Sequence, residues 1–307
     1  MLTFTFTVRV PRLAVATSLT PNPILSTMPQ PLRLMAVLAH PDDESLGFGG
    51  TLAKYSAEGV ETFLVTATSG DRGRLGDHRF GTAGHPGGKQ IARIRETELR
   101  EAAVILGVRD LSLLGYPDGH LDEVDPREII RRIVALVRRV RPDVVITFAP
   151  DGGYGHPDHI AISQFAGAAL VAAADPGHIA ASGSPALAPH AVAKLYHLVS
   201  PRSAWDIYQA AFKKLVSTVD GVERHAVPWP DWEITTTLDA REQIANVWRA
   251  VCCHKSQIEN YTGLWNLEPA DHAELWGRQH FYRAYSTVNG GRRPEHDLFE
   301  GVRDTDR

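Results

Sequence analysis

Short apolar runs alternate along this chain with longer segments of helical periodicity, and this alternation restricts the fold more than any other feature. Apolar runs that predict buried strands occupy residues 33–39, 62–66, 111–114, 144–148 and 195–199. Between the first four lie helical patterns at residues 45–58, 89–106 and 126–140. Continuous apolar strands are typical of parallel sheets that helices cover on both faces. The chain is therefore predicted to adopt an α/β fold with a Rossmann-like, doubly wound, mostly parallel sheet.

The rest of the chain is assigned to the same domain or to its loops. Further helices are predicted at residues 203–215, 239–254 and 271–284. Two long loops stand out: the glycine-rich residues 70–88, which we expect to be functional, and residues 172–192, which we expect to be a plain surface insertion. Residues 1–31 lack the pattern of the rest and are expected to be a loosely ordered accessory tail. One domain is therefore predicted over residues 32–307.

Composition excludes several classes of function. The formal net charge of -4 among 307 residues gives no reason to expect a nucleic acid as partner. No apolar stretch approaches the roughly 20 residues that a membrane span needs. The only cysteines, Cys252 and Cys253, are adjacent, and a bridge between neighbours is strained. Reduced thiols fit a cytoplasmic protein. The sequence leaves open whether the chain is a homo-oligomer.

Two polar clusters follow two of the predicted strands directly. Ala39-His40-Pro41-Asp42-Asp43-Glu44 ends the first strand, and residues 149–159, which include Tyr154 and His156-Pro157-Asp158-His159, follow the fourth. Open α/β sheets bind ligands beyond the carboxyl ends of their strands. If the two strands are neighbours, the two clusters face each other across the place where a site is expected.

The spacing within the clusters suits a metal ion. His40 and Asp43 are three residues apart, as are His156 and His159, so each pair can point to one side of a turn. Catalytic zinc takes three protein ligands and a water, and these residue types suit Zn²⁺, although Fe²⁺ is chemically feasible. Spacing alone does not decide between His156 and His159. Asp42, beside the predicted ligands, could take a proton from water. The alternative, in which Asp42 and Asp43 only cap a helix, explains one cluster but not two.

These motifs resemble those of a known family. AHPDDE, followed about a hundred residues later by GYGHPDH, is similar to the LmbE-like or PIG-L family of zinc-dependent N-acetylglucosaminyl deacetylases. The resemblance extends over roughly residues 33–300. Supporting matches are found at residues 95–99, 114–119 and 254–257.

The resemblance implies a role for each motif residue. It implies that zinc is bound by His40, Asp43 and His159, and that Asp42 is the general base. It makes His156 the group that stabilises the oxyanion, with its imidazolium oriented by Asp158, and it places Tyr154 near the same oxygen. It suggests that Arg95 and Asp118 contact sugar hydroxyls. The implied function is a hydrolase that removes the N-acetyl group from a small N-acetylglucosamine-type conjugate, with a zinc-activated water attacking the amide.

Three other functions are considered. A dinucleotide-dependent oxidoreductase would need a G-x-G-x-x-G turn after the first strand, where this chain has HPDDESLGFGG instead. A non-catalytic sugar-binding protein of the same fold, or an amidase acting on a thiol-sugar conjugate, would use the same scaffold. The variable parts that we expect to shape the substrate pocket are the 70–88 loop and an aromatic stretch that contains Trp265, Trp276, Phe281 and Tyr282.

Overall fold

The computed structural model describes residues 30–178, 187–212, 216–219, 221–259 and 261–304. The predicted tail therefore lies almost entirely outside the described residues, and so does the middle of the predicted 172–192 loop. The predicted domain start, residue 32, immediately precedes the first strand.

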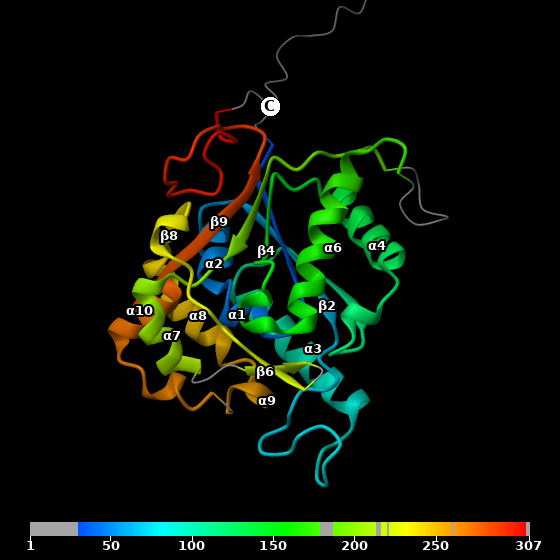
Figure 1. Ribbon diagram of the computed structural model, residues 1–307, viewed down its shortest axis with the longest axis vertical. Helices are drawn as coiled ribbons and strands as arrows, with labels where there is room; N and C mark the ends of the chain where they lie inside the picture. The colour runs from blue at the N-terminus through cyan, green and yellow to red at the C-terminus, as the bar shows by residue number, and fades with distance from the viewer. Residues whose placement is uncertain (1–29, 179–186, 213–215, 220, 260, 305–307) are drawn as a thin grey trace, which may run out of the picture. The chain divides into compact units, whose positions relative to one another are not determined.

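A seven-stranded sheet forms the centre of the described domain, with strand order β3-β2-β1-β4-β5-β9-β8 (Figure 1). Its strands are β1 (Arg33–Leu38), β2 (Glu61–Thr68), β3 (Asp110–Tyr116), β4 (Val144–Phe148), β5 (Lys194–Leu198), β8 (Thr236–Asp239) and β9 (Arg278–Ser286). The pairs β1–β2, β2–β3, β1–β4 and β4–β5 are parallel, whereas β9 runs antiparallel to β5 and β8 antiparallel to β9. The predicted mostly parallel sheet is confirmed, with an antiparallel edge that the apolar runs did not indicate.

Helices cover both faces of the sheet. Helices α4 (Pro126–Val140) and α6 (Pro157–Ala174) pack against each other on one face, while α2 (Gly49–Ala57) and α3 (Gly88–Ile105) pack against α8 (Ile244–Val251) on the other (Figure 1). The remaining helices are α1 (Asp43–Leu46), α5 (Gly152–Gly155), α7 (Trp205–Phe212), α9 (Lys255–Ile258) and α10 (Pro269–Gly277). No helix in the described ranges is long and apolar enough to cross a bilayer.

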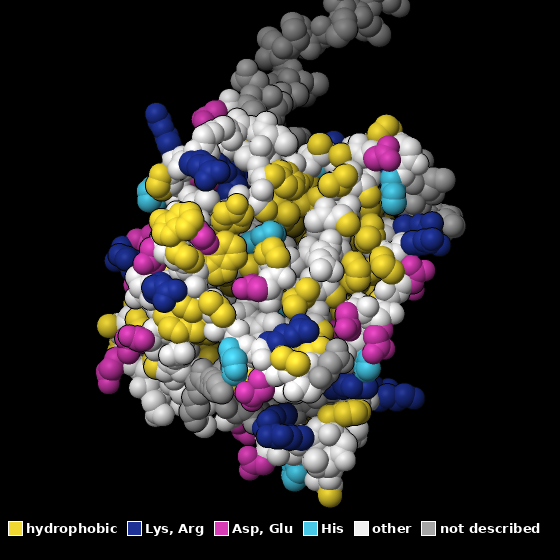
Figure 2. Space-filling model, viewed as in Figure 1, with side chains coloured by type: hydrophobic (Ala, Val, Ile, Leu, Met, Phe, Trp, Pro, Cys, Tyr) yellow, Lys and Arg dark blue, Asp and Glu magenta, His cyan; other side chains and the backbone are white. Residues whose placement is uncertain are grey.

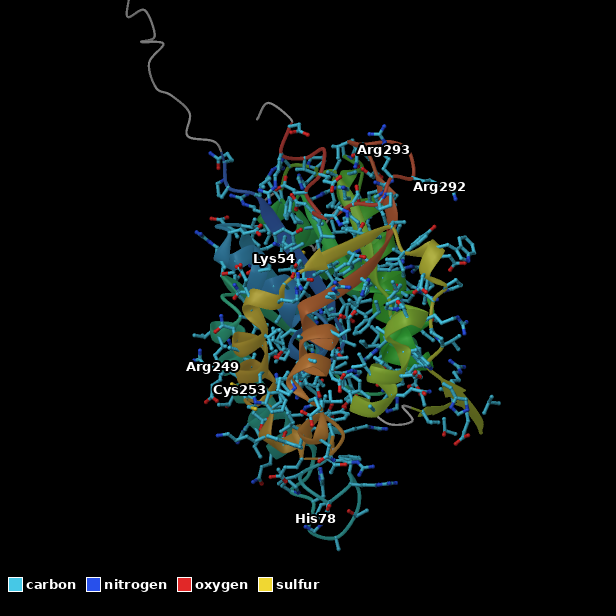
Figure 3. All side chains as sticks on the ribbon, turned by 90° about the vertical axis from the view of Figure 1, so that its left-hand side faces the viewer. Lys54, His78, Arg249, Cys253, Arg292 and Arg293 are labelled. Carbon is cyan, nitrogen blue, oxygen red and sulfur yellow. The ribbon has the colours of Figure 1, made fainter. Side chains whose placement is uncertain are left out.

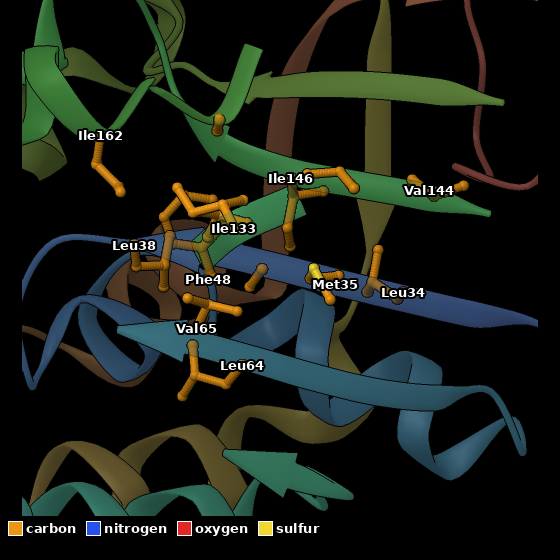
Figure 4. Packing of buried hydrophobic residues seen from close by; sticks show 14 of the residues in the cluster. Leu34, Met35, Leu38, Phe48, Leu64, Val65, Ile133, Val144, Ile146 and Ile162 are labelled. Carbon is orange, nitrogen blue, oxygen red and sulfur yellow. The ribbon is translucent and has the colours of Figure 1, made fainter. Parts of the chain in front are cut away.

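The core lies between the sheet and these helices. Leu34, Met35 and Leu38 of β1 are at most 1% exposed, and they pack beside Ile146 of β4 and Ile133 of α4 (Figure 4). Burial of both faces explains why β1 and β4 are continuous apolar runs. The core therefore fixes the central strands, and with them the two loops at their carboxyl ends.

Three predicted helices differ from the structure. The one predicted over residues 239–254 is reduced to α8, because Asp239 ends β8 and Arg241–Gln243 form a 3-10 turn. The pattern over residues 45–58 is divided into α1 and α2, and Gly50 approaches the backbone oxygen of Trp276 so closely that a Cβ would not fit. The predicted helix over residues 271–284 ends at Gly277, because residues 278–286 form β9 instead. Antiparallel pairing with β5 outweighs the local helical pattern there.

A small hairpin and a long loop lie outside the central sheet. Strands β6 (Val216–Val219) and β7 (Val222–His225) pair antiparallel, and α5 packs against both of them. The glycine-rich 70–88 loop extends away from the rest of the domain, and His78 lies on its extended part (Figure 3).

Candidate metal centre and active site

The two HPD segments meet at one edge of the sheet. Strands β1 and β4 are hydrogen-bonded neighbours, with Leu34 opposite Val144 and Ala36 opposite Ile146. The strands end at Leu38 and Phe148, and the following loops lead into α1 and α6. The expectation that the two clusters face each other is confirmed, because parallel neighbours carry their carboxyl ends to the same edge.

His40, Asp43 and His159 bring two ring nitrogens and one carboxylate group close together. His40 Nδ1 lies 3.1 Å from His159 Nε2, and His159 Nε2 lies 3.4 Å from Asp43 Oδ1. The other carboxylate oxygen, Asp43 Oδ2, is 3.7 Å from His40 Nδ1. Tetrahedral zinc with bonds of about 2.0–2.2 Å separates its ligand atoms by about 3.3–3.6 Å. The observed separations are close to this range, with a different oxygen of Asp43 facing each histidine.

Each of these three side chains is held by a second partner. His40 Nε2 lies 3.1 Å from an oxygen of Asp158 and 3.1 Å from one of Asp118. His159 Nδ1 lies 3.2 Å from the carbonyl oxygen of Gly152, and the backbone N–H of His40 donates to Asp43 at 2.7 Å. Such outer contacts fix the tautomer and orientation of metal-binding histidines. Burial raises the pKa of Asp43 to about 7, and a divalent cation would favour its ionised form.

Asp42 has a strained backbone and a paired carboxylate. Its φ of 117° lies in the left-handed region that favours glycine, and such outliers cluster at functional sites. The carboxylate lies 3.1 Å from Arg95 Nη2. Burial raises the pKa of Asp42, although the positive charge of Arg95 opposes the shift. Asp42 lines the same cavity as the three metal-binding candidates, which suits a group that exchanges a proton.

His156 is close enough to the cluster to be a fourth candidate ligand. One ring nitrogen each of His40, His156 and His159 lies within 4.8 Å of the other two. His156 Nδ1 accepts a hydrogen bond from the backbone N–H of Asp158 at 3.2 Å. This contact leaves the other nitrogen, Nε2, as the one that carries hydrogen in the neutral ring.

Two expectations for His156 need correction. The side chain of Asp158 does not orient it; that carboxylate contacts His40 and accepts from the backbone N–H groups of Gly119 and Leu121. The imidazolium form is also disfavoured, because burial, followed by the neighbouring charge of His40, lowers the pKa of His156 to about 4. Burial outweighs the charges of Asp158 and Asp118, which act in the opposite direction and favour the charged ring.

Arg95 and Asp118 are engaged within the protein. Arg95 is 4% exposed, and its guanidinium donates to the carbonyl oxygens of Pro41 and Gly70 besides pairing with Asp42. Asp118 contacts His40 at 3.1 Å and Arg95 at 3.7 Å. Both side chains line the cavity, and these contacts also tie them to Pro41, Asp42 and His40 in the loop after β1.

Tyr154 lies beside the histidine cluster. Its ring is 5.3 Å from that of His159 and 5.7 Å from that of His156, and it lines the cavity. Burial raises the pKa of Tyr154 well above its usual value. The phenol is therefore a neutral hydrogen-bond donor next to the predicted metal site.

The structure adds a buried residue pair that the sequence did not assign. Glu44 and His254 contact each other at 2.6 Å, and Glu44 also accepts from the backbone N–H of Asp42 at 3.0 Å. His254 belongs to the short segment His254–Gln257, in which Glu98 accepts hydrogen bonds from the backbone N–H and hydroxyl of Ser256. The sequence match over residues 254–257 was the one signal for this segment.

A cavity of about 260 Å³ is lined by the three metal-binding candidates together with Asp42 and His156. Its outer wall is aromatic, but the residues differ from those expected. Trp276 and Phe281 are fully buried in the core, and neither Trp265 nor Tyr282 lines the cavity. The wall is formed instead by Trp205, Tyr208, Phe212, Trp229 and Tyr261. No described residue of the 70–88 loop lines the cavity, so the expected role of that loop in shaping the pocket gains no support from the structure.

Comparisons with known proteins agree with this geometry. Residues 35–170 match the PIG-L family model, described as GlcNAc-PI de-N-acetylase. A 1D-myo-inositol 2-acetamido-2-deoxy-alpha-D-glucopyranoside deacetylase from Kineococcus radiotolerans is 34% identical, over 91% of this chain and 85% of the relative. A conserved protein of known structure from Thermus thermophilus is 26% identical with a TM-score of 0.58, covering 84% of this chain and 97% of that one.

A second solved structure supports the fold. The N,N'-diacetylchitobiose deacetylase from Pyrococcus horikoshii has a TM-score of 0.60 and 21% identity, covering 82% of this chain and 83% of that one. At this identity the likeness concerns the arrangement of strands and helices. The mostly parallel sheet is thus shared with a protein of known structure.

Proposed function

This chain belongs to the PIG-L family of deacetylases, and on that premise we propose that it is a metal-dependent hydrolase that removes the acetyl group from an N-acetylglucosamine conjugate. The observation that carries the proposal is the cluster of His40, Asp43 and His159: the facing ring nitrogens are 3.1 Å apart, and the two oxygens of Asp43 lie 3.4 Å from His159 and 3.7 Å from His40. This cluster lines a cavity that Asp42 also lines. A three-ligand metal with an open side is the arrangement of a catalytic site.

A divalent ion held by His40, Asp43 and His159 would polarise the amide carbonyl and make a water more acidic. Zn²⁺ suits two imidazoles and a carboxylate, and Fe²⁺ is accepted by the same set. The outer contacts of His40 with Asp158 and Asp118 would hold its Nδ1 toward such an ion.

Asp42 is proposed as the group that moves the proton. Its buried carboxylate takes a proton from the attacking water and later gives it to the leaving amine. Arg95, 3.1 Å away, keeps the carboxylate ionised and in place before the attack. Burial acts in the opposite direction and favours the protonated form, which is the form needed to protonate the amine.

His156 is proposed to stabilise the oxyanion as a neutral donor. Its Nδ1 accepts from the backbone of Asp158, so the proton is on Nε2. A preorganised N–H aimed at the developing charge stabilises the transition state without a net positive charge. Tyr154, a neutral phenol beside His156, is proposed as a further donor to the same oxygen.

We propose that the substrate is a small conjugate of N-acetylglucosamine with a cyclitol. The support is the Kineococcus relative, whose name specifies the 1D-myo-inositol conjugate and of which this chain covers 85%. We further propose that the protein works in a reducing compartment, since Cys252 and Cys253 are free thiols.

The test is acetate release from N-acetylglucosaminyl-inositol by protein loaded separately with Zn²⁺ and, anaerobically, with Fe²⁺. We expect turnover that chelation abolishes and metal addition restores. Metal-loaded, folded protein that binds the conjugate without releasing acetate would favour a non-catalytic sugar-binding protein. Release of a larger acyl group in preference to acetate would favour the amidase alternative.

A further inference from the structure

Four aromatic side chains form a continuous row along the outer wall of the cavity. Trp205, Tyr208 and Phe212 come from one face of α7, and Tyr261 follows α9. The rings of Trp205 and Tyr208 are stacked, with centroids 5.1 Å apart and planes 13° apart. The next two pairs continue the row: the centroids of Tyr208 and Phe212 are 5.1 Å apart, and those of Phe212 and Tyr261 are 5.8 Å apart. We call these four residues the aromatic ladder.

The ladder begins at the catalytic groups and leads away from them. Tyr261 lines the same cavity as the proposed base Asp42 and the proposed metal ligands. In the middle of the ladder, Tyr208 and Phe212 also line a second, smaller cavity. A substrate whose acetamido group lies at the metal would therefore extend its remaining part along these rings. Figure 2 shows hydrophobic side chains gathered on the face of the molecule where Figure 1 places α7 and α10.

The chemistry of the ladder is that of a surface for an uncharged ring. None of its four side chains is charged, and aromatic rings offer large apolar faces for contact. Tyr154, Tyr208 and Tyr261 all line the cavity. Across the described residues, none of their three hydroxyls has a hydrogen-bond partner in the protein, so each can bind a ligand. Stacking faces together with free hydroxyls suit a ring that has a C–H face and hydroxyl groups at its edge.

We propose that the aromatic ladder is the subsite for the aglycone of the sugar conjugate, and that it selects an uncharged polyhydroxylated ring. The proposal rests on the proposed deacetylase function and adds to it the residues that recognise the part of the substrate that does not react. Trp205 and Phe212 supply stacking area, while Tyr208 adds a hydroxyl to its ring. The ladder thus distinguishes conjugates by their aglycone, whereas the metal and Asp42 act on the amide that all of them share.

The test uses four N-acetylglucosaminides that separate ring from hydroxyl groups: methyl, glyceryl, cyclohexyl and myo-inosityl. We expect kcat/KM to be highest for the inosityl conjugate, followed by the cyclohexyl one, with the two acyclic conjugates lowest. Trp205→Ala should lower the ratio of kcat/KM for the ring conjugates to kcat/KM for the methyl conjugate by about 2- to 10-fold, which is the usual contribution of one aromatic contact. Tyr208→Phe keeps the aromatic ring of the side chain and removes its hydroxyl. It should therefore lower only the ratio of kcat/KM for the inosityl conjugate to kcat/KM for the cyclohexyl conjugate.

Trp232→Ala is the matched control, because Trp232 is 81% exposed and does not line the cavity. It should leave all four ratios at the wild-type values. The proposal is overturned if Trp205→Ala lowers kcat/KM equally for the methyl and ring conjugates, or if the wild type does not prefer rings.

A binding measurement separates this proposal from the proposed function. Calorimetry on the metal-free full chain compares the deacetylated products glucosaminyl-inositol and methyl glucosaminide. Tighter binding of the inositol product, lost in Trp205→Ala but not in Trp232→Ala, supports the subsite even if no turnover is found. Equal binding of the two products argues against the subsite even if deacetylation is found.

Discussion

The carboxylate of Glu44 and the imidazole of His254 form a buried pair, with Oε1 and Nε2 2.6 Å apart. The side chains are 0% and 2% exposed. The other oxygen of Glu44 accepts from the backbone N–H of Asp42 at 3.0 Å, where φ is 117°. A strained conformation persists only where its surroundings hold it. The pair therefore connects the segment after α8 to the backbone of the proposed base.

His254→Ala should reduce turnover without removing the metal. The variant leaves Glu44 buried and unpaired, which costs about 3–5 kcal/mol of unfolding free energy. Because small displacements of a catalytic group can cost up to ~10²-fold, we expect kcat to fall by about 10- to 100-fold while KM changes little. The measurements are kcat, KM, metal content and urea unfolding. His254→Gln, which retains a donor, should recover part of both losses.

Ser256→Ala is the control for this pair. It loosens the same segment by removing one contact with Glu98, but it does not touch Glu44. We expect a loss of stability with much less effect on kcat. Equal kcat losses in stability-matched His254→Ala and Ser256→Ala proteins would mean that the pair has no specific role in positioning Asp42.

Asp42→Asn should separate proton transfer from metal binding. The amide retains the shape of the side chain but cannot accept the proton, so kcat should fall by ~10²–10⁴-fold. Metal content should stay near one per chain, because the three proposed ligands are unchanged. Asp110→Asn, a substitution of a carboxylate that is 52% exposed, serves as the control. Turnover close to the wild-type value in metal-loaded Asp42→Asn protein would exclude Asp42 as the base.

The sequence predicted the central part of the fold well and its edge poorly. Strands β1 and β4 are buried on both faces, so their apolar runs are visible in any window of the sequence. Strand β9 has an irregular burial pattern and depends on pairing with β5, which lies more than 80 residues earlier in the chain. Local periodicity carries no information about such a partner, and the helix predicted over residues 271–284 was therefore partly wrong.

The same reason explains the limits of the site prediction. The motifs placed His40, Asp43 and His159 together because each is local to a strand end. They could not show that Asp158 contacts His40, since these residues are 118 positions apart. Nor did they indicate the aromatic ladder, because Trp205, Tyr208 and Phe212 at helical spacing are equally typical of a core-facing helix.

His156→Ala and His159→Ala should differ in metal content. His159→Ala removes a proposed ligand, so metal should fall well below one per chain when measured by atomic emission after gel filtration. His156→Ala should keep the metal and lose ~10²–10³-fold in kcat, the usual cost of one oxyanion donor. His120→Ala, which changes a histidine outside the cavity lining, should behave as the wild type. Loss of metal in His156→Ala would make His156 a ligand instead.

Glu295→Gln should change the response of stability to acid. Glu295 is 1% exposed and accepts hydrogen bonds from Lys194, Tyr196 and Arg283. Burial alone would raise its pKa, but these partners, Lys194 first, lower it below the usual value of 4.5. A carboxyl group with a lowered pKa stabilises the fold at pH values above its unfolded-state pKa, and this stabilisation is lost as the pH falls through its folded-state pKa.

At pH 7 the substitution leaves Lys194 without its partner carboxylate, so we expect a loss of about 3–5 kcal/mol in urea unfolding. The loss of unfolding free energy relative to the wild type should be as large at pH 6 as at pH 7, and it should shrink below pH 4.5. The control is Glu123→Gln, at a side chain that is 72% exposed, which should change the unfolding free energy little at pH 6 or below pH 4.5. A constant difference between pH 6 and pH 3.5 would mean that ionisation of Glu295 does not hold this cluster together.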